Sequence, residues 1–244
     1  MNDLLINPDE DPMKRPADAA QRDSFPKLIS FSGVDGAGKS TQIEALCAAI
    51  QDAGMKFRII RFWDDVARLV RFREAASVGV FKSDTGVGAP GAPVNRRDKN
   101  VRSWYMTCVR LGLYTVDAVS LQGVIREALR SGCEVVIFDR FIFDELANLN
   151  LKNSLVRIYI RLVLALVRKP DISFVLDADP VQARARKPEY PLEFLYVSRE
   201  SYLTLSRMID GITVIAPKPM EEVKREILRH GAGLFSGKDR QYVA

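Results

Sequence analysis

The chain has 244 residues, 47% of them hydrophobic, which suffices for one large domain with a well-developed core. Its single histidine, His230, argues against a Ser-His-Asp triad or a multi-histidine zinc site, and its three widely spaced cysteines argue against a disulfide framework. The formal net charge of +5 is mildly basic and suits an anionic ligand.

The N-terminal half predicts an arm, two strands, two helices and a loop. Residues 1–24 are acidic, contain prolines and lack an apolar run, so we expect a disordered arm and no secretory signal. The elements that follow are a strand at 27–32, a helix at 40–53, a strand at 56–62 and a long helix at about 100–130. Four glycines and two prolines in residues 78–98 predict a mobile loop.

The C-terminal half continues the alternation of strands and helices. Strands are expected at 134–138, 172–176 and 212–215, and helices at 151–167, 191–208 and 220–229. Five strands separated by helices predict an α/β fold in three layers, with a mainly parallel five-stranded sheet. We expect one domain at residues 25–231 and a C-terminal tail at 232–244. The apolar stretch 155–167 contains two arginines and is too short to cross a bilayer, so no membrane span is expected.

The most informative motif lies between the first predicted strand and the first predicted helix. Residues 33–41 read Gly-Val-Asp-Gly-Ala-Gly-Lys-Ser-Thr and match G-x-x-x-x-G-K-[ST] at every fixed position. In such a loop, backbone N–H groups surround phosphates, Lys39 can reach the β- and γ-phosphates, and the Ser40 hydroxyl can ligate Mg²⁺. The motif therefore predicts a P-loop fold that binds a nucleotide, with Mg²⁺ at its phosphates. The expected nucleotide-binding residues are Gly33, Gly36, Gly38, Lys39, Ser40 and Thr41.

Asp139 and Arg140 follow the predicted strand at 134–138, at the sheet edge where α/β proteins bind ligands. A carboxylate there can hold Mg²⁺ through water, and an arginine can bind an anionic phosphate. A surface salt bridge at a strand end is the alternative interpretation of the same pair.

Three cations, Arg184, Arg186 and Lys187, lie between the strand that ends near Asp177 and the next helix. Such a segment, at about 180–190, can form a lid that stabilises the charge of a phosphoryl group in the transition state. From the residues alone, a solvated basic turn explains the segment equally well.

Several motifs together carry a family resemblance. They are Phe31–Gln42, Phe138–Phe141, Leu176–Pro180 (Leu-Asp-Ala-Asp-Pro), Pro188–Leu195 and Tyr202-Leu203. Over nearly all of residues 27–230, the sequence resembles the thymidylate kinase family of nucleoside monophosphate kinases. The resemblance implies transfer of a phosphoryl group from ATP with Mg²⁺ to a nucleoside monophosphate, with dTMP as the leading acceptor. It also implies an enzyme of nucleotide biosynthesis. The three widely spaced cysteines fit a reducing compartment, so we expect a cytoplasmic protein.

The resemblance assigns roles to individual positions. Asp35 would contact the acceptor's sugar hydroxyl or the Mg²⁺ shell, and Arg140 would hold the acceptor phosphate. Arg184 and Arg186 would be lid arginines, because Gly36 stands where some family members carry a catalytic arginine within the phosphate loop. The expected catalytic set is Lys39, Asp35, Arg140, Arg184 and Arg186, and the expected metal-binding set is Ser40 and Asp139.

The departures from the family pattern concern the acceptor. Where the family shows Arg-Glu-Pro-Gly, this chain keeps Arg61 and has Trp63 as a stacking platform. In the long helix, the family often reads Phe-x-x-Asp-Arg, whereas this chain has Tyr114, Asp117 and Ala118 in the matching stretch. Alanine cannot form the hydrogen bond that the family's arginine makes to thymine, and losing such a bond weakens discrimination strongly. The expected acceptor-binding residues are Asp35, Arg61, Trp63, Tyr114, Asp117 and Arg140.

Three functions stay open on the sequence. The first is a nucleoside monophosphate kinase. The second is a kinase of the same fold for another small molecule, in which Asp35 or Asp64 would serve as base for a hydroxyl acceptor. The third is a nucleotide-binding protein without kinase turnover, for which the helix at 155–167 would offer a partner or membrane-surface face. A core or homodimer helix is the simpler interpretation of that segment, and nucleic-acid binding is least favoured.

Overall fold

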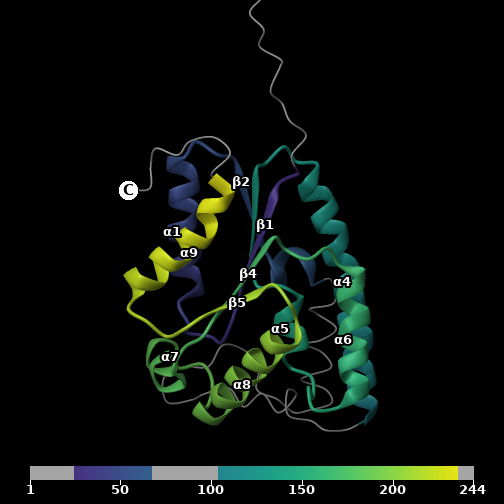
Figure 1. Ribbon diagram of the computed structural model, residues 1–244. Helices are drawn as coiled ribbons and strands as arrows, with labels where there is room; N and C mark the ends of the chain where they lie inside the picture. Colours follow the sequence, from purple (N-terminus) through teal and green to yellow (C-terminus); the bar gives the residue numbers. More distant parts are fainter. Residues whose placement is uncertain (1–24, 68–103, 236–244) are drawn as a thin grey trace, which may run out of the picture.

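The computed structural model describes residues 25–67 and 104–235. Five strands form one sheet: β1 (Lys27–Ser32), β2 (Phe57–Arg61), β3 (Val135–Asp139), β4 (Ile172–Leu176) and β5 (Ile212–Ile215). Their order is β2-β3-β1-β4-β5, and every pairing is parallel (Figure 1). The predicted α/β fold with a parallel five-stranded sheet is therefore confirmed.

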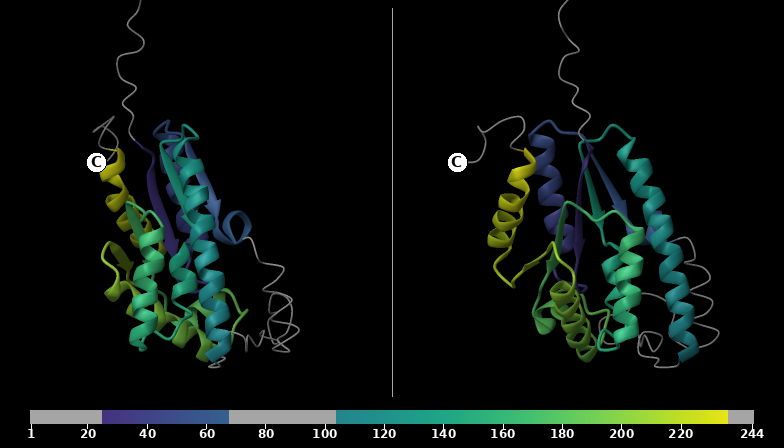
Figure 2. Two further views of the ribbon diagram at one scale, coloured as in Figure 1. Left: turned by 90° about the vertical axis from the view of Figure 1, so that its right-hand side faces the viewer. Right: turned by 45° about the vertical axis from the view of Figure 1, so that its right-hand side comes forward.

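Helices cover both faces of this sheet. On one face lie α1 (Lys39–Asp52) and α9 (Met220–Phe235), and on the other lie α4 (Trp104–Leu129) and α6 (Ser154–Leu166) (Figure 2). Side chains alternate along β1, so that Ile29 and Phe31 join the apolar cluster with α1 and α9, while Leu28 joins the cluster with α4 and α6. The three layers thus enclose two separate apolar clusters, one on each face of the sheet.

Four further elements lie near the carboxyl ends of the strands or follow them. The π-helix η1 (Phe62–Val66) follows β2, and α5 (Ile142–Leu146) follows β3. The helices α7 (Pro180–Arg186) and α8 (Leu192–Met208) lie below the sheet in Figure 1. Ligands of open parallel sheets bind at this edge, so these elements surround the place where a site is expected.

The structure differs from the predicted elements in three places. The segment expected to be a basic loop is largely the helix α7, which Asp179 begins by accepting hydrogen bonds from the backbone N–H groups of Val181 and Gln182. The buried helix α5 was not predicted at all. The last helix continues to Phe235, so His230 lies within it, against the ring of Phe174, and not at a helix end.

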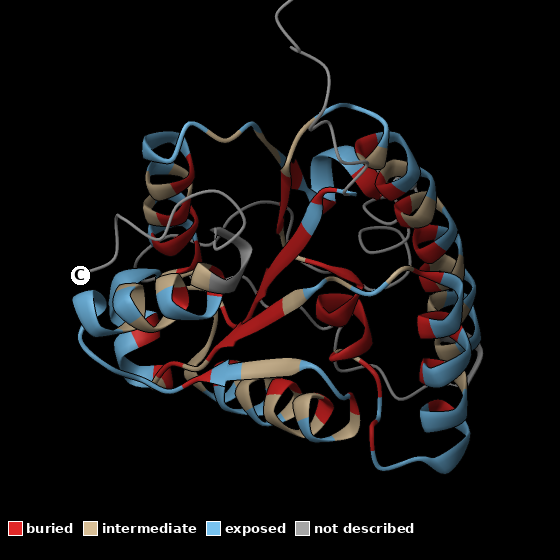
Figure 3. Ribbon diagram, turned by 45° about the horizontal axis from the view of Figure 1, so that its top comes forward, coloured by how far each residue is buried: buried red, intermediate tan, exposed pale blue. Residues whose placement is uncertain are grey.

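One helix, Thr107–Leu129 within α4, is long and apolar enough to cross a membrane by length and composition alone. Its residues Ala118, Leu121 and Ile125 are fully buried and belong to the apolar cluster that also contains residues of α6. Figure 3 shows the buried residues of the helices in red, on the side that faces the sheet. We therefore assign α4 to the core layer of the domain. The expected acidic arm (1–24), the loop at 78–98 and residues 236–244 of the expected tail lie outside the described residues.

Candidate active site

The phosphate loop connects β1 to α1, as its spacing predicts. Gly33, Gly36 and Gly38 all have positive φ angles, of 136°, 83° and 88°. A Cβ atom on Gly33 would lie 2.5 Å from the carbonyl oxygen of Leu176, and one on Gly36 would lie 2.2 Å from that of Ala183. Only glycine satisfies both the backbone conformation and this close approach of β4 and α7. The loop is therefore shaped by contacts from distant parts of the chain as well as by its own sequence.

Lys39 is the first residue of α1, and its side chain is buried beneath the loop. Its Nζ donates hydrogen bonds to the carbonyl oxygens of Gly33 (2.8 Å) and Val34 (2.9 Å). Burial, aided by the nearby Arg140 guanidinium, lowers the pKa of Lys39 to about 8, although neighbouring carboxylates oppose the shift. A bound phosphate would replace these carbonyl partners and favour the charged lysine.

Arg140 lies between two carboxylates, at the carboxyl end of β3. Its φ angle is 70°, and its backbone N–H donates to the carbonyl oxygen of Phe31 on β1 (3.0 Å). The guanidinium forms ion pairs with Asp35 of the phosphate loop and, at 2.9 Å, with Asp144 of α5. Burial acts to lower the pKa of Arg140, but Asp144 and Asp35 overcome this effect and raise it above its usual value. The arginine is therefore permanently charged and held on two sides.

A cleft opens beside this ion-pair cluster. Four of the residues expected at the site line it: Gly33, Asp35, Trp63 and Arg140. The remaining lining residues are Val34, Asp144, Ala147, Asn148, Phe194, Leu195, Ser198 and Tyr202. The contribution of α8 was not predicted, although Phe194 and Tyr202 lie in stretches that carry the family resemblance. Aromatic walls beside an arginine can bind a planar, anionic ligand.

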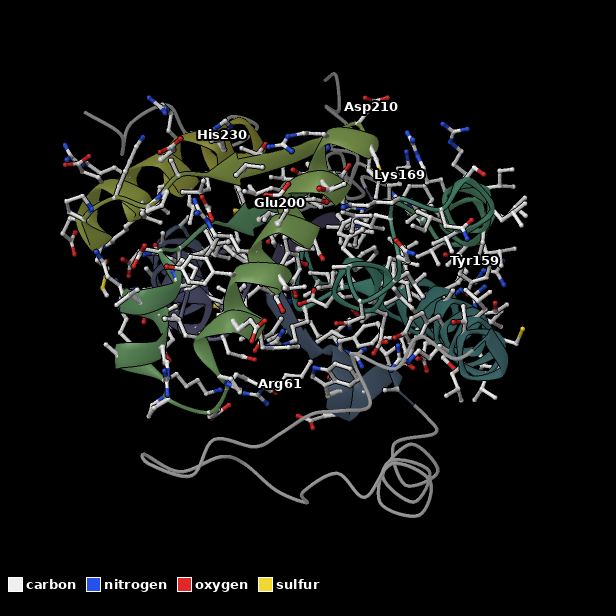
Figure 4. The ribbon with its side chains drawn as sticks, turned by 90° about the horizontal axis from the view of Figure 1, so that it is seen from below. Arg61, Tyr159, Lys169, Glu200, Asp210 and His230 are labelled. Atoms are coloured by element: carbon white, nitrogen blue, oxygen red, sulfur yellow. The ribbon has the colours of Figure 1, made fainter. Side chains whose placement is uncertain are left out.

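The other expected acceptor residues lie elsewhere. Tyr114 and Asp117 are buried in α4 and do not line this cleft. Arg61 is exposed at the end of β2, on the side of the molecule seen in Figure 4. Of the four acceptor-side residues expected from β2 and the long helix, the structure brings only Trp63 to the cleft.

The basic end of α7 touches the phosphate loop directly. Arg186 donates a hydrogen bond from Nη1 to the carbonyl oxygen of Gly36 (3.2 Å). Arg184, two residues earlier in α7, is exposed. The Nζ of Lys187 lies 3.8 Å from the carboxylate of Asp35 and 3.2 Å from that of Glu189. The expected lid segment is thus adjacent to the phosphate loop and bears its positive charge there.

The two residues expected to bind Mg²⁺, Ser40 and Asp139, both offer oxygen atoms as ligands. Ser40 is exposed at the start of α1, and Asp139 ends β3 close enough to Lys39 for its carboxylate to raise the pKa of that lysine. Within residues 25–67 and 104–235, no group of three or more His, Cys, Asp or Glu side chains could hold a metal ion. A hydroxyl and a carboxylate fit Mg²⁺, which keeps several waters and shares its coordination with substrate phosphates.

Comparisons with known proteins find similar chains. The chain is 30% identical over 164 residues to the thymidylate kinase of Pelodictyon phaeoclathratiforme, an alignment that covers 66% of this chain and 65% of that relative. It is 26% identical over 211 residues to the probable thymidylate kinase of Archaeoglobus fulgidus, covering 82% and 92% of the two chains. The chain belongs to the thymidylate kinase family.

Two further comparisons complete this assignment. The crystal structure of thymidylate kinase from Ehrlichia chaffeensis matches the fold with a TM-score of 0.54 and 18% identity, covering 85% of this chain and 98% of that one. At that identity, the likeness supports the kinase fold alone. No protein-family model matches the chain. In this chain, the phosphate loop contacts both Arg140, through Asp35, and α7, through Arg186.

Proposed function

We propose that this protein transfers the γ-phosphoryl group of ATP to a nucleoside monophosphate, with dTMP as the leading acceptor. The observation that carries the proposal is the link between the two anion-binding groups. Lys39, beneath the phosphate loop, and Arg140, directly after β3, both lie near the carboxylate of Asp35, which lines the cleft, so a donor and an acceptor phosphate would meet there. Family membership gives the reaction type.

In this proposal, the chain acts by positioning and by neutralising charge. The phosphate loop and Lys39 hold the β- and γ-phosphates, and Arg140 holds the acceptor phosphate in line with them. Arg184 and Arg186 stabilise the charge of the transferring group from α7. Ser40 and Asp139 would hold Mg²⁺, which supplies charge neutralisation at the donor phosphates. No general base is needed, because an acceptor phosphate is already ionised.

The acceptor's base would lie against the aromatic walls of the cleft. Trp63 and Phe194 offer faces and edges for stacking, and Asn148 and Ser198 offer polar groups. The residue at the family's thymine-reading position is Ala118, which is fully buried. We therefore propose that this enzyme distinguishes dTMP from other pyrimidine monophosphates less sharply than a site with an arginine contact to thymine.

A panel of acceptors tests the function. The protein is incubated with Mg-ATP and, separately, with dTMP, dUMP, dCMP, dGMP, AMP and thymidine, and ADP release is followed against a reaction without acceptor. We expect turnover with dTMP and weaker turnover with dUMP. Turnover with thymidine but not with dTMP would favour the same-fold kinase of a hydroxyl acceptor, with Asp35 as base. Binding of ATP without turnover of any acceptor would instead indicate a nucleotide-binding protein.

We further propose that the protein forms a homodimer through α4 and α6 and acts in the cytoplasm. The inner face of α6 is buried, but its outer face exposes a stripe of large apolar side chains, next to two valines of α4. They are Leu155, Ile158, Leu162 and Leu166 on α6, and Val116 and Val119 on α4. Leu155 is 73% exposed and Leu162 63%, and large apolar side chains exposed in this number on two neighbouring helices favour an interface.

Replacing Leu162 by glutamate tests the dimer. The wild type is expected to sediment as a dimer, and Leu162→Glu as a monomer, since a buried unpaired carboxylate opposes association. The matched control is Arg207→Glu at an exposed position of α8, which should leave the dimer intact. A monomeric wild type would contradict the proposal, and binding of that monomer to anionic vesicles would point to a membrane-surface role.

A further inference from the structure

Asp144 is a buried carboxylate at the centre of the cleft wall, and the family resemblance assigns it no role. Its side chain is only 2% exposed, within the short helix α5. Oδ1 accepts hydrogen bonds from Arg140 Nη1 (2.9 Å) and from the Tyr202 hydroxyl (2.8 Å). Oδ2 accepts from the Ser32 hydroxyl (2.6 Å) and from the backbone N–H of Phe141 (3.3 Å). Asp144 thus joins β1, the turn after β3 and α8.

These four hydrogen bonds decide what Asp144 can do. A carboxylate has about four lone-pair sites, and each oxygen of Asp144 already accepts two bonds. No acceptor site is left for a substrate hydroxyl or a metal ion. Asp144 is therefore suited neither to a general base nor to a magnesium ligand, and its effect must pass through the groups that it binds.

The most important of these groups is Arg140. Free rotation of an arginine side chain would spread its guanidinium over many positions, and a phosphate would have to order it on binding. Here the backbone of Arg140 is bound to β1, and its guanidinium is bound by Asp35 on one side and by Asp144 on the other. Asp35 lies on the phosphate loop, which itself has to receive the nucleotide. Asp144 is the more deeply buried of the two partners.

Tyr202 keeps the carboxylate in place from α8. Burial raises the pKa of Tyr202 well above its usual value, and the charge of Asp144 adds to this effect, so the hydroxyl keeps its proton and donates it. Tyr202 and Arg140 bind the same oxygen, Oδ1, and α8 follows directly after the lid helix α7. Through Asp144, the position of the Arg140 guanidinium therefore depends on α8, the helix that carries Tyr202.

We propose that Asp144, anchored by Tyr202, is a positioning residue that holds the Arg140 guanidinium in place for the acceptor phosphate. The proposal rests on the proposed function only in that the anion bound by Arg140 is the acceptor's phosphate. The order imposed on Arg140 is a property of the protein without substrate.

Kinetics test the consequence of this positioning. Asp144→Asn keeps the shape but turns an N–H group toward donors, so we expect the KM for the acceptor to rise about 10- to 100-fold, while the KM for ATP changes less than about twofold. Tyr202→Phe should raise the acceptor KM in the same direction by about 3- to 10-fold. The matched control is Tyr159→Phe, which removes a tyrosine hydroxyl bonded to Leu111 and Thr115 on the far helix pair and should leave both KM values unchanged (Figure 4).

A spectroscopic measurement tests the positioning itself without any turnover. In ¹⁵N-labelled protein, the Nη groups of Arg140, assigned with Arg140→Lys, should give separate signals because the two carboxylates hinder rotation of the guanidinium. These signals should merge in Asp144→Asn and broaden in Tyr202→Phe, but stay separate in Tyr159→Phe. If Asp144→Asn does not fold, the acceptor KM and the Arg140 signals are both measured on Tyr202→Phe instead.

The two readouts separate the possible failures. If the wild type turns over no nucleoside monophosphate while the Arg140 signals still merge in Asp144→Asn, the proposed function fails and the positioning of Arg140 stands. If the signals remain separate in folded Asp144→Asn, the positioning role is overturned. If the signals merge but the acceptor KM does not change, Arg140 is not positioned for the acceptor, and the proposal is equally overturned.

Discussion

Replacing Lys39 by methionine is expected to abolish phosphoryl transfer, with kcat falling by at least about 10²- to 10³-fold. The reason is that Lys39 is the one cation of the phosphate loop, and it lies within reach of the place where donor phosphates would lie. The nucleotide-free variant should nevertheless fold, because burial already lowers the pKa of Lys39 to about 8 and makes its charge unfavourable in the empty site. Steady-state kinetics and thermal unfolding with and without Mg-ATP measure both effects.

The pH dependence of the wild type gives an internal control for this variant. Phosphate binding requires the protonated lysine, whereas the empty site favours its neutral form above about pH 8. The affinity for Mg-ATP is therefore expected to be constant between pH 7 and 7.5 and to weaken above pH 8, by up to about tenfold per pH unit. Lys39→Met should lack this dependence. Undiminished activity of Lys39→Met would contradict the phosphate-loop assignment.

Removing both lid arginines, by Arg184→Ala and Arg186→Ala together, is expected to lower kcat by about 10³-fold or more. Arginines that neutralise a transferring phosphoryl group contribute 10³- to 10⁵-fold in related chemistry, and in this chain Gly36 leaves no arginine inside the loop. The carbonyl oxygen of Ala183 occupies the space that a side chain at Gly36 would need. Affinity for ATP should change much less than kcat, since these groups act mainly on the transition state.

The control for the lid variant removes the same charge elsewhere. Arg207 of α8 is 69% exposed, pairs only loosely with Glu200 at 3.6 Å and lies outside the cleft, so Arg207→Ala should leave kcat within about twofold of the wild type. The single variants then apportion the effect between Arg184 and Arg186. If the double variant retains full turnover, α7 has no lid role and its basic end is a solvated surface.

Some parts of the fold follow from local sequence patterns. The strands β1, β3 and β4 are buried on both faces and appear as short apolar runs, so their positions are predictable to within a residue or two. By contrast, α5 has five residues, all buried, and is too short to show a helical period. Asp179 and Pro180 are typical of a helix start, so the beginning of α7 is predictable. Its basic residues, however, are compatible with either a helix or a loop.

The phosphate loop is the part of the candidate site that the local amino-acid sequence is sufficient to predict. A loop of backbone N–H groups needs glycines with positive φ at set spacings, followed by a lysine at the start of a helix, and these requirements are local. The resemblance added Arg140 and the basic residues of α7. It also placed Tyr114 and Asp117 on the acceptor side, whereas the packing of α4 against the sheet turns both into the core.

The tertiary arrangement, and no local spacing, brings Ser32, Asp35 and Tyr202 to the pair formed by Arg140 and Asp144. Strand order places β3 beside β1, so Arg140 and Asp144 arrive next to Ser32 and Asp35 from more than a hundred residues away, and α8 brings Tyr202 to the same carboxylate. None of these pairs has a spacing that a local pattern could reveal, because their proximity depends on the order of strands in the sheet and on helix packing. The sequence alone determined how the donor phosphates would be held, and the fold decided what surrounds the arginine proposed to hold the acceptor.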